Sequence, residues 1–327
     1  MDFHFKPYHP IENLSREEFI ATIYDNGLAG GEFIVQEKIH GANLCFITDG
    51  QVIYSAKRTG LLKEDERFFN FQKVRDKYKE QILKAHSLVT KLYPETDLLY
   101  IFGELFGGYY PHPDVPKVKD AIQLQQGVCY SADNDFYAFD LRIHNASYLS
   151  LDESMSIFEE LGFLYAKELF RGTLDACLAF PYEFESKIPG YLGLPVIASN
   201  IAEGLVIKPL EAKFLPSKAR VIIKNKNPKY EEKIIKKTKH KKTKVKLTDA
   251  CKKLAQEAEN YINQNRLDAA ISKLGEVHDG QLIGFLAKDA YEDFAKDFIK
   301  ELEALDKEEQ KQIRQIISKT AGVLVRS

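Results

Sequence analysis

The chain has 327 residues, of which 44% are hydrophobic and 29% are charged, so it can bury a large core and is long enough for two domains. Its 46 basic and 48 acidic side chains give a net charge of −2, which excludes a protein that coats nucleic acid by bulk charge but allows a local basic patch. The four cysteines lie far apart without a CxxC pair, which argues against a disulfide scaffold or zinc ribbon.

No apolar run approaches the ~20 residues needed to span a bilayer. The N-terminal residues contain neither a signal-peptide core nor an Arg-rich amphipathic presequence. We therefore expect a soluble protein without a membrane partner. The expected location is a reducing compartment, namely the cytoplasm, or the host-cell cytoplasm if the source is viral.

Short strand-like runs dominate the first two thirds of the chain. They are rich in β-branched and aromatic residues and are bounded by Gly or Asp. The predicted strands cover residues 31–35, 44–47, 51–56, 98–102, 136–143, 204–208 and 220–224.

Two helices are predicted among these strands. Apolar residues recur at spacings of three and four over residues 74–92, which indicates an amphipathic helix. Ser150 and Glu153 form a capping box that should begin a second helix, and Gly162 can end it. The Pro- and Gly-rich stretches predicted as surface loops are residues 107–116 and 189–195.

The composition changes near residue 227. Eleven lysines and two glutamates lie between residues 224 and 246, a charge of +9 that leaves −11 for the rest of the chain. Helical periodicity then appears over residues 248–264, 266–274, 281–303 and 306–319. We predict an α+β domain (residues 1–228), a basic linker (229–246) and a small all-helical domain (247–327).

The segment EKIHGAN (residues 37–43) carries the clearest chemical signal. A lysine between a strand and a glycine turn can point into a cleft, where neighbouring cations favour its neutral, nucleophilic form. Such help is needed, because a free lysine has a pKa of about 10.4 and is almost fully protonated at neutral pH. Taken by itself, Lys38 would more often be a surface lysine in a turn.

Other segments could complete a site around Lys38: AKRTG (56–60), FGELFGG (102–108), DFYAFD (135–140), AEGLVIKP (202–209) and VIIKNKN (221–227). Each has a plain alternative, such as a solvated turn for Arg58, ordinary core for Phe139, or strand-end ion pairs for the glutamates. Lys224 and Lys226 should share one strand face, which could also be a solvated edge.

In their order along the chain, these segments resemble the motifs of the covalent nucleotidyltransferases, which include ATP-dependent ligases and mRNA capping enzymes. The lysine segment is similar to that of the RNA ligase 2 family, which includes a phage double-stranded RNA ligase and kinetoplastid RNA-editing ligases. DNA ligases and capping enzymes typically have Asp at the position of His40. The segment NRLDAAISKLGE (265–276) is similar to the C-terminal domain of the phage enzyme.

This resemblance implies an α+β fold, with an antiparallel-sheet, ATP-grasp-like nucleotidyltransferase domain followed by a small all-helical domain. It also implies an ATP-dependent RNA ligase that joins 3′-OH and 5′-phosphate ends, with a nick in duplex RNA as the favoured substrate. In the family, a lysine attacks the α-phosphate of ATP, AMP passes to the RNA 5′-phosphate, and the 3′-OH then displaces AMP. Lys38 occupies the position of that lysine.

The resemblance implies ATP and Mg²⁺ as cofactors, with Mn²⁺ able to replace Mg²⁺. Phe139 should stack on adenine, and Arg58 and Glu104 should hold the ribose. Glu203 should bind Mg²⁺ directly or through water. The other implied nucleotide contacts are Glu37, His40, Asn43, Lys208, Lys224 and Lys226. The three lysines of this set should surround the α-phosphate and stabilise charge in the transition state.

In the helical domain, Arg266 and Asp289 match positions that the phage enzyme uses for RNA sealing. Arg266 could bind a phosphate, and Asp289 could orient a protein cation or a ribose hydroxyl. A surface helix ion pair is the plain alternative for both. The basic linker could contact RNA phosphates or simply be solvated.

Two rival functions stay open. One is another lysine nucleotidyltransferase, such as a DNA ligase or a GTP-using capping enzyme, although His40 and the helical tail argue against relatives that usually carry a β-rich OB domain. The other is a non-catalytic RNA-binding repair scaffold on a ligase fold.

Overall fold

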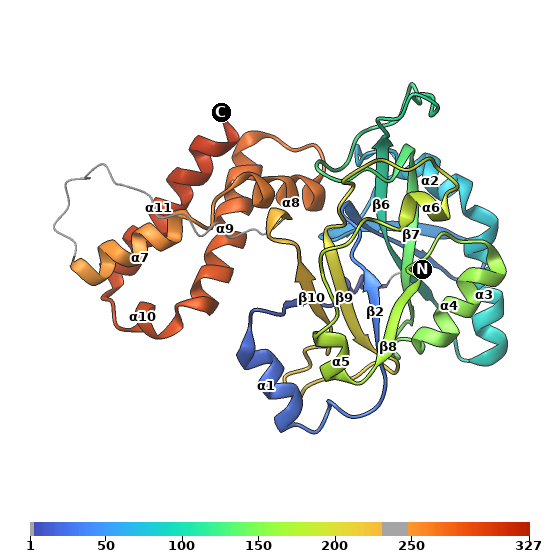
Figure 1. The fold of residues 1–327 in the computed structure, drawn as a ribbon, viewed down its shortest axis with the longest axis horizontal. Helices are drawn as coiled ribbons and strands as arrows, with labels where there is room; N and C mark the ends of the chain where they lie inside the picture. The colour runs from blue at the N-terminus through green and yellow to red at the C-terminus, as the bar shows by residue number, and fades with distance from the viewer. Residues whose placement is uncertain (1–2, 231–247) are drawn as a thin grey trace. The chain divides into compact units, whose positions relative to one another are not determined.

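The computed structural model describes residues 3–230 and 248–327. The chain divides into two compact units, Met1–Lys229 (unit 1) and Tyr230–Ser327 (unit 2). Unit 1 contains two five-stranded sheets and unit 2 contains helices (Figure 1). The predicted α+β class, with antiparallel sheets and a helical C-terminal region, is confirmed. Most of the predicted basic linker, residues 231–246, lies outside the described residues.

Sheet A is formed, in spatial order, by β1 (Glu12–Asn13), β10 (Ile223–Lys226), β9 (Gly204–Pro209), β2 (Phe33–Glu37) and β8 (Glu168–Gly172). Its neighbouring strands are antiparallel, except that β1 runs parallel to β10. Sheet B is formed by β5 (Gly60–Leu61), β4 (Ile53–Lys57), β3 (Ala42–Thr48), β6 (Leu99–Tyr109) and β7 (Ser131–Ile143). Its pairs are all antiparallel.

The helices of unit 1 are α1 (Glu17–Asp25), α2 (Phe71–Lys77), α3 (Lys79–Leu92), α4 (Leu151–Leu161), α5 (Leu174–Leu178) and α6 (Ile188–Tyr191). A 3₁₀ turn at Pro228–Tyr230 includes the last residues of unit 1 and the first of unit 2. The predicted capping box of α4 is present, because Ser150 Oγ accepts from the Glu153 N–H and Glu153 bonds back to the Ser150 backbone. Gly162 ends this helix in the left-handed conformation with φ 72°.

Three hydrophobic cores organise unit 1 into layers. One core joins α2, α3 and α4 to one face of sheet B, and α3 and α4 lie next to each other on that side (Figure 1). A second core joins α1 and α5 to one face of sheet A. The third lies between the facing sheets and includes Cys45, Phe102 and Val206. Polar residues at the end of this middle layer are therefore enclosed by both sheets.

Several predicted boundaries are wrong for local reasons. The predicted helix over residues 74–92 is two helices that meet at Tyr78. The predicted loop 107–116 begins inside β6, which continues to Tyr109. A Cβ on Gly108 would lie 2.1 Å from the Ile122 carbonyl oxygen. Glycine is therefore needed because the segment around Ile122 passes close to β6 at this position, and not because the chain turns there. Likewise, residues 189–191 of the second predicted loop lie in α6.

Unit 2 consists of α7 (Asp249–Glu259), α8 (Gln264–Leu274), α9 (Asp279–Asp297), α10 (Ile299–Glu303) and α11 (Lys307–Val325) around one apolar core. Thr248, Asn263 and Asp306 cap α7, α8 and α11 with side-chain oxygens. The helix predicted over residues 281–303 is divided at Phe298. Among the helices of both described ranges, none is long and apolar enough to cross a membrane.

Candidate functional site

Three charged side chains meet at neighbouring ends of β2, β9 and β10. Lys38 Nζ lies 2.8 Å from Glu203 Oε2, and Lys226 Nζ lies 3.1 Å from Glu203 Oε1. The exposed fraction of the side chain is 18% for Lys38, 8% for Lys226 and 2% for Glu203. Two lysines therefore hold opposite oxygens of one buried carboxylate. We call this group the Lys38 cluster.

The backbone of sheet A fixes the Lys38 cluster. Lys38 directly follows β2, and its N–H donates to the Gly204 carbonyl oxygen at 2.9 Å. Lys226 pairs with Gly204 at the start of β9. A Cβ on Gly204, whose φ is 147°, would lie 2.1 Å from the Asn225 carbonyl oxygen. Glycine permits this close approach of β9 and β10, which places the preceding Glu203 beside both lysines.

The surrounding cations keep Glu203 ionised. Burial by itself raises the pKa of this carboxyl, but the ammonium groups of Lys38 and Lys226 outweigh burial and lower the pKa to about 2. His40 also faces the carboxylate, with Nδ1 3.8 Å from Glu203 Oε2. The backbone N–H of His40 donates to the Tyr130 hydroxyl at 3.0 Å, which fixes the turn after Lys38.

Lys224 shares a strand face with Lys226, as their spacing predicts. It lies opposite Val206 of β9, and Val206 packs on the core between the two sheets. Both lysines of β10 therefore lie on the face of sheet A that is turned toward sheet B.

Glu104 contributes a second acidic group from sheet B. It lies opposite Asn43 in the β3–β6 pair, and the Asn43 amide donates to a β6 carbonyl oxygen at 3.4 Å. Burial raises the pKa of Glu104 to about 8, because the attraction of Lys38 and Arg58 offsets only part of it and Glu203 adds to it. At neutral pH this carboxyl is protonated, so it can both donate and accept hydrogen bonds.

Arg58 lies in the turn between β4 and β5, close enough to Glu104 for their charges to interact. Its guanidinium donates to the backbone carbonyl of Tyr8, which anchors the N-terminal segment over sheet B. Burial lowers the pKa of Arg58 from its ordinary value, but the side chain remains a cation at neutral pH. The two residues predicted to hold a ribose are therefore neighbours.

A β-bulge gives Phe139 and Asp140 a shared environment. The β6–β7 register shifts after Phe102, which leaves Phe139 without a cross-strand partner. Consecutive strand residues normally point to opposite faces. Here the Phe139 ring packs against the Tyr8 ring with centroids 4.9 Å apart, and the Asp140 carboxylate accepts a hydrogen bond from the Tyr8 hydroxyl.

Lys208 belongs to a separate buried network around Asp140. Its Nζ lies 2.9 Å from the Phe139 carbonyl oxygen and 3.2 Å from Asp140 Oδ2. Arg220 donates to both Asp140 oxygens at 3.0 and 3.1 Å. Burial lowers the pKa of Lys208 to about 8, although Asp140 opposes this. The charge partner of Lys208 is thus Asp140 and not Glu203. Tyr8, Asp140, Lys208 and Arg220 are hereafter the Asp140 network.

Three members of this network, Tyr8, Asp140 and Arg220, are not among the residues predicted from the sequence. A buried lysine needs a carboxylate partner, and Asp140 directly follows Phe139, so this residue could have been found. Tyr8 and Arg220 are 132 and 80 residues from Asp140 in the chain, and neither lies in a pattern that indicates this contact.

Glu37 binds a different segment. Its carboxylate accepts hydrogen bonds from Ser186 Oγ at 2.6 Å and from the Lys187 backbone N–H at 2.8 Å. Burial raises the pKa of Glu37 to about 7, and these two donors offset only part of the rise. The structure therefore places this predicted nucleotide contact beside residues 186–187 and outside the Lys38 cluster.

In unit 2, Arg266 and Asp289 form an ion pair between α8 and α9. Arg266 Nη1 lies 2.5 Å from Asp289 Oδ2, and Nη2 lies 3.1 Å from Asp293 Oδ2. Lys273 Nζ lies 2.7 Å from the other Asp289 oxygen. The Arg266 side chain is only 2% exposed, so its plain alternative of a surface ion pair is wrong. Asp289 orients protein cations, whereas the Arg266 guanidinium that was predicted to bind phosphate is engaged by carboxylates.

The described residues provide no group of three or more His, Cys, Asp or Glu side chains arranged to hold a metal ion. Glu203 is ionised and offers one carboxylate beside two cations. Mg²⁺ commonly binds one or two protein carboxylates and takes its other ligands from water and substrate phosphates. The donor set at Glu203 fits that kind of site, with most ligands supplied from outside the protein.

The arrangement combines a potential amine nucleophile with cations that can bind phosphate. Lys38 supplies the amine, and Lys226 supplies a positive charge that is already positioned by Glu203. Phe139 adds an aromatic face that is not fully buried. These are the components expected of a site where a lysine amine attacks a nucleotide phosphate while the base stacks on an aromatic ring.

Comparisons with known proteins agree with this chemistry. Residues 31–226 match the family model described as RNA ligase, and residues 244–322 match the one described as T4 RNA ligase 2 C-terminal. Mitochondrial RNA-editing ligase 1 of Trypanosoma brucei brucei is 34% identical over 235 residues, 62% of this chain and 50% of that protein. RNA-editing ligase 2 of the same organism is 30% identical over 352 residues, 90% of this chain and 83% of that protein.

This chain therefore spans about half the length of the first of these relatives. A solved structure of a Naegleria gruberi RNA ligase variant with ATP and Mn aligns with a TM-score of 0.46 and 18% identity, over 70% of this chain and 58% of that one. The match to the RNA ligase family model covers most of unit 1, and the relationship to RNA-editing ligase 2 extends over nearly the whole chain. The chain belongs to the RNA ligase family, in its RNA ligase 2 branch.

Proposed function

We propose that this protein is an ATP-dependent RNA ligase that joins RNA 3′-OH and 5′-phosphate ends through an adenylate on Lys38. The observation that carries the proposal is the Lys38 cluster, in which a potential amine nucleophile and a second lysine share one buried, ionised carboxylate. Membership of the RNA ligase family selects RNA joining among the possible nucleotidyl transfers.

In the first step, Lys38 Nζ forms a bond to the α-phosphorus of ATP while the bond to the pyrophosphate leaving group breaks. The amine must lose a proton and leave its ion pair with Glu203 before it can attack. The entering triphosphate is an alternative anionic partner for both lysines, so ATP binding can draw Lys38 away from Glu203. The adenylate then passes to an RNA 5′-phosphate, and a 3′-OH displaces AMP.

The nucleoside should occupy the space between the sheets beside this cluster. Phe139 offers its ring to the adenine, while Arg58 and the protonated Glu104 can hydrogen-bond the ribose hydroxyls. Lys208 is held by Asp140 at the carbonyl of Phe139, so it supports the adenine platform from the Asp140 network. Asn43 and His40 border the same region from the chain that follows Lys38.

We propose Mg²⁺ as the metal, with Mn²⁺ as a substitute, and Glu203 as its protein ligand. When bound, the ion would reduce the negative charge of the triphosphate. We also propose that a nick in duplex RNA is the preferred substrate. The support for this preference is the helical unit that matches the C-terminal family model, since two RNA ends must be held while one adenylate reacts.

Label transfer from a nucleotide tests the proposed activity directly. The full chain is incubated with ATP or GTP labelled in the α-phosphate, or with adenylate-labelled NAD, and then separated by denaturing electrophoresis. An RNA ligase should retain label from ATP alone, and the labelled protein should then seal nicked duplex RNA. Label from GTP would indicate a capping enzyme, sealing of DNA alone would indicate a DNA ligase, and the absence of label would favour a scaffold.

A further inference from the structure

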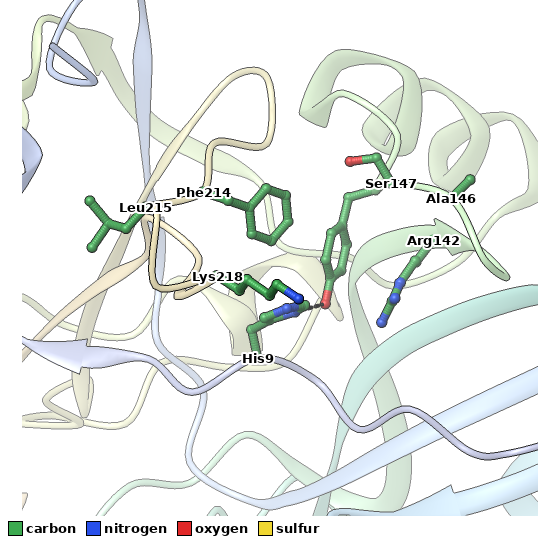
Figure 2. A pocket seen from close by; sticks show the side chains of 8 residues that line it. His9, Arg142, Ala146, Ser147, Phe214, Leu215 and Lys218 are labelled. Atoms are coloured by element: carbon green, nitrogen blue, oxygen red, sulfur yellow. Dashed lines mark hydrogen bonds between the residues drawn. The ribbon is translucent and has the colours of Figure 1, made fainter. Parts of the chain in front are cut away.

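A cavity of ≈ 350 Å³ lies beside the Asp140 network and contains none of the predicted ATP contacts (Figure 2). Its lining residues are His9, Arg142, Ala146, Ser147, Tyr148, Phe214, Leu215 and Lys218. The volume falls in the range of about 300–1,000 Å³ that is usual for small-ligand sites.

Tyr148 forms the wall between this cavity and the Asp140 network. Its hydroxyl lies 2.9 Å from His9 Nδ1 on the cavity side. The Arg220 guanidinium lies over its ring, 3.7 Å from the ring centroid. The hairpin that places Arg220 in the network also brings Phe214 and Lys218 into the cavity, because Phe214 and Arg220 are bridged across it.

Two cations border the cavity without an acidic partner. Neither Arg142 nor Lys218 forms an ion pair with any residue in the ranges 3–230 and 248–327. Arg142 lies over the Tyr148 ring at 5.6 Å, which leaves its N–H groups to a ligand. Lys218 has a φ of 66°, a strained conformation for a long side chain, and Figure 2 shows its amine turned toward His9.

The cavity also has aromatic walls. The His9 ring contacts the rings of both Phe214 and Tyr148, with centroids 5.3 and 5.6 Å away. Burial, together with Arg142 and Arg220, lowers the pKa of His9 to about 4, so this ring is neutral at physiological pH. Phe214 is 36% exposed and therefore presents part of its ring to an incoming group.

We propose that this cavity binds one phosphate-bearing nucleotide, with its base against Phe214 and Tyr148 and its phosphate between Arg142 and Lys218. Aromatic faces combined with unpaired cations are the usual means of holding single-stranded nucleic acid. The proposal rests on the proposed function in one respect, since it takes the nucleotide to belong to an RNA strand near the ends being joined. A free mononucleotide has the same chemistry and is the alternative source.

Equilibrium binding to the full chain carrying Lys38→Ala tests this site, because that variant cannot form an adenylate on Lys38. The probes are a fluorescent, 5′-phosphorylated single-stranded RNA and, separately, AMP. Arg142→Gln and Lys218→Gln each remove one charge, and Phe214→Leu removes an aromatic face. The matched control is Lys84→Gln on α3, where the side chain is 66% exposed and lies on the helix-covered side of sheet B.

Each pocket variant should weaken RNA binding by about tenfold, a typical loss for one charged hydrogen bond or one stacked base. A plot of the logarithm of the RNA association constant against the logarithm of the salt concentration has a negative slope. Each of the two charge variants should make that slope less steep by about 0.7. The control should change affinity less than about twofold. Weaker AMP binding with unchanged RNA binding would support the site and show that its ligand is a free nucleotide and not part of an RNA strand.

Unchanged affinity for both probes in Arg142→Gln and Lys218→Gln would overturn the proposal. A thermal melt of each variant excludes loss of folding as the reason for weak binding. The measurement requires neither ATP nor joining. Its outcome is therefore independent of the label-transfer experiment, and either idea can fail while the other stands.

Discussion

Lys38 Nζ lies 2.8 Å from Glu203 Oε2, so the predicted nucleophile and the predicted metal ligand form one ion pair. The direct charge partner of Lys38 is therefore a carboxylate, not one of the neighbouring lysines that the sequence places around it. The second Glu203 oxygen binds Lys226. Any attack by the Lys38 amine would therefore require this ion pair to break first.

Glu203→Gln should strongly destabilise unit 1, because it leaves two largely buried lysines without their carboxylate. Breaking a buried ion pair from one side typically costs ~3–5 kcal/mol. Glu66→Gln is the matched control, since Glu66 pairs with Lys57 at 2.7 Å but is 27% exposed, and should cost at most ~1 kcal/mol. Urea unfolding of both variants measures the difference. Similar losses for the two would mean that the Lys38 cluster contributes no more than a surface pair.

Lys38→Ala should abolish covalent labelling by ATP, since no amine remains at that position. Lys38→Arg should be equally inactive in this step, because the guanidinium stays protonated. Both variants should retain part of the joining of pre-adenylylated RNA, whose last step needs no lysine nucleophile. Lys84→Ala should label like the unaltered protein. A labelled Lys38→Ala protein would show that another residue is the nucleophile.

Glu104 should make stability fall as pH rises. The pKa of its carboxyl is about 8 in the folded protein and 4.5 ordinarily, so the folded state retains a proton that the unfolded chain loses over this interval. Its stabilising effect is complete below about pH 4.5 and is lost as pH rises through about 8. Glu104→Gln removes this titration, so its melting temperature should rise relative to the unaltered protein between these pH values.

The control for this pH series is Glu80→Gln, because the Glu80 side chain is 84% exposed. Its melting temperature should keep a constant offset from that of the unaltered protein. A constant offset for Glu104→Gln as well would mean that Glu104 is ionised in the folded state. Its proposed contact with a ribose would then be that of an acceptor only.

Phe139→Ala should raise the KM for ATP in self-labelling, because it removes the face on which adenine is proposed to stack. Lost base stacking costs ~1–3 kcal/mol, or about 5- to 150-fold in affinity. Phe139→Leu keeps an apolar surface and should show a smaller increase. Because the ring also packs on Tyr8, melting temperatures must accompany the kinetics. Equal KM values for Phe139→Ala and the unaltered protein would remove Phe139 from the nucleotide site.

Local patterns were sufficient for much of the fold. The Ser150 capping box, the strand content of unit 1 and the helical content of unit 2 follow from neighbouring residues, and the structure has all of them. The errors arose where tertiary contacts decide the backbone. Gly107 and Gly108 suggest a loop, but β7 and the segment around Ile122 approach them closely and keep the chain in β6.

The candidate site divides in the same way. Lys38, Glu203 and Lys226 could be predicted because each lies in a short motif beside a strand, and the strand pairing then brings them together. The Asp140 network could not be assembled from sequence, because its charge balance depends on the distant Tyr8 and Arg220. Periodicity identifies which residues share a face, but it does not identify which buried charges neutralise one another.

The division of work between the two units gives the last prediction. The residues predicted to contact ATP precede residue 227, so a chain ending at residue 244 should form the lysyl-adenylate. It should fail to seal nicked duplex RNA, because joining requires two RNA ends beside the adenylate, and a misplacement of ~1 Å can cost ~100-fold in rate. Full sealing by this shortened chain, on the same RNA and at the same salt, would refute the division.

Arg266→Ala in the full chain should also reduce sealing more than self-labelling, but to a smaller extent than the truncation. The Arg266 side chain is 2% exposed and bonded to Asp289 and Asp293, so its loss leaves two partly buried carboxylates with less compensation and should loosen α8 against α9. Sealing should therefore fall while self-labelling is retained. Lys288→Ala, at a side chain 76% exposed on α9, should leave both activities unchanged. Equal loss of labelling and sealing in Arg266→Ala would mean that unit 2 also supports the first step.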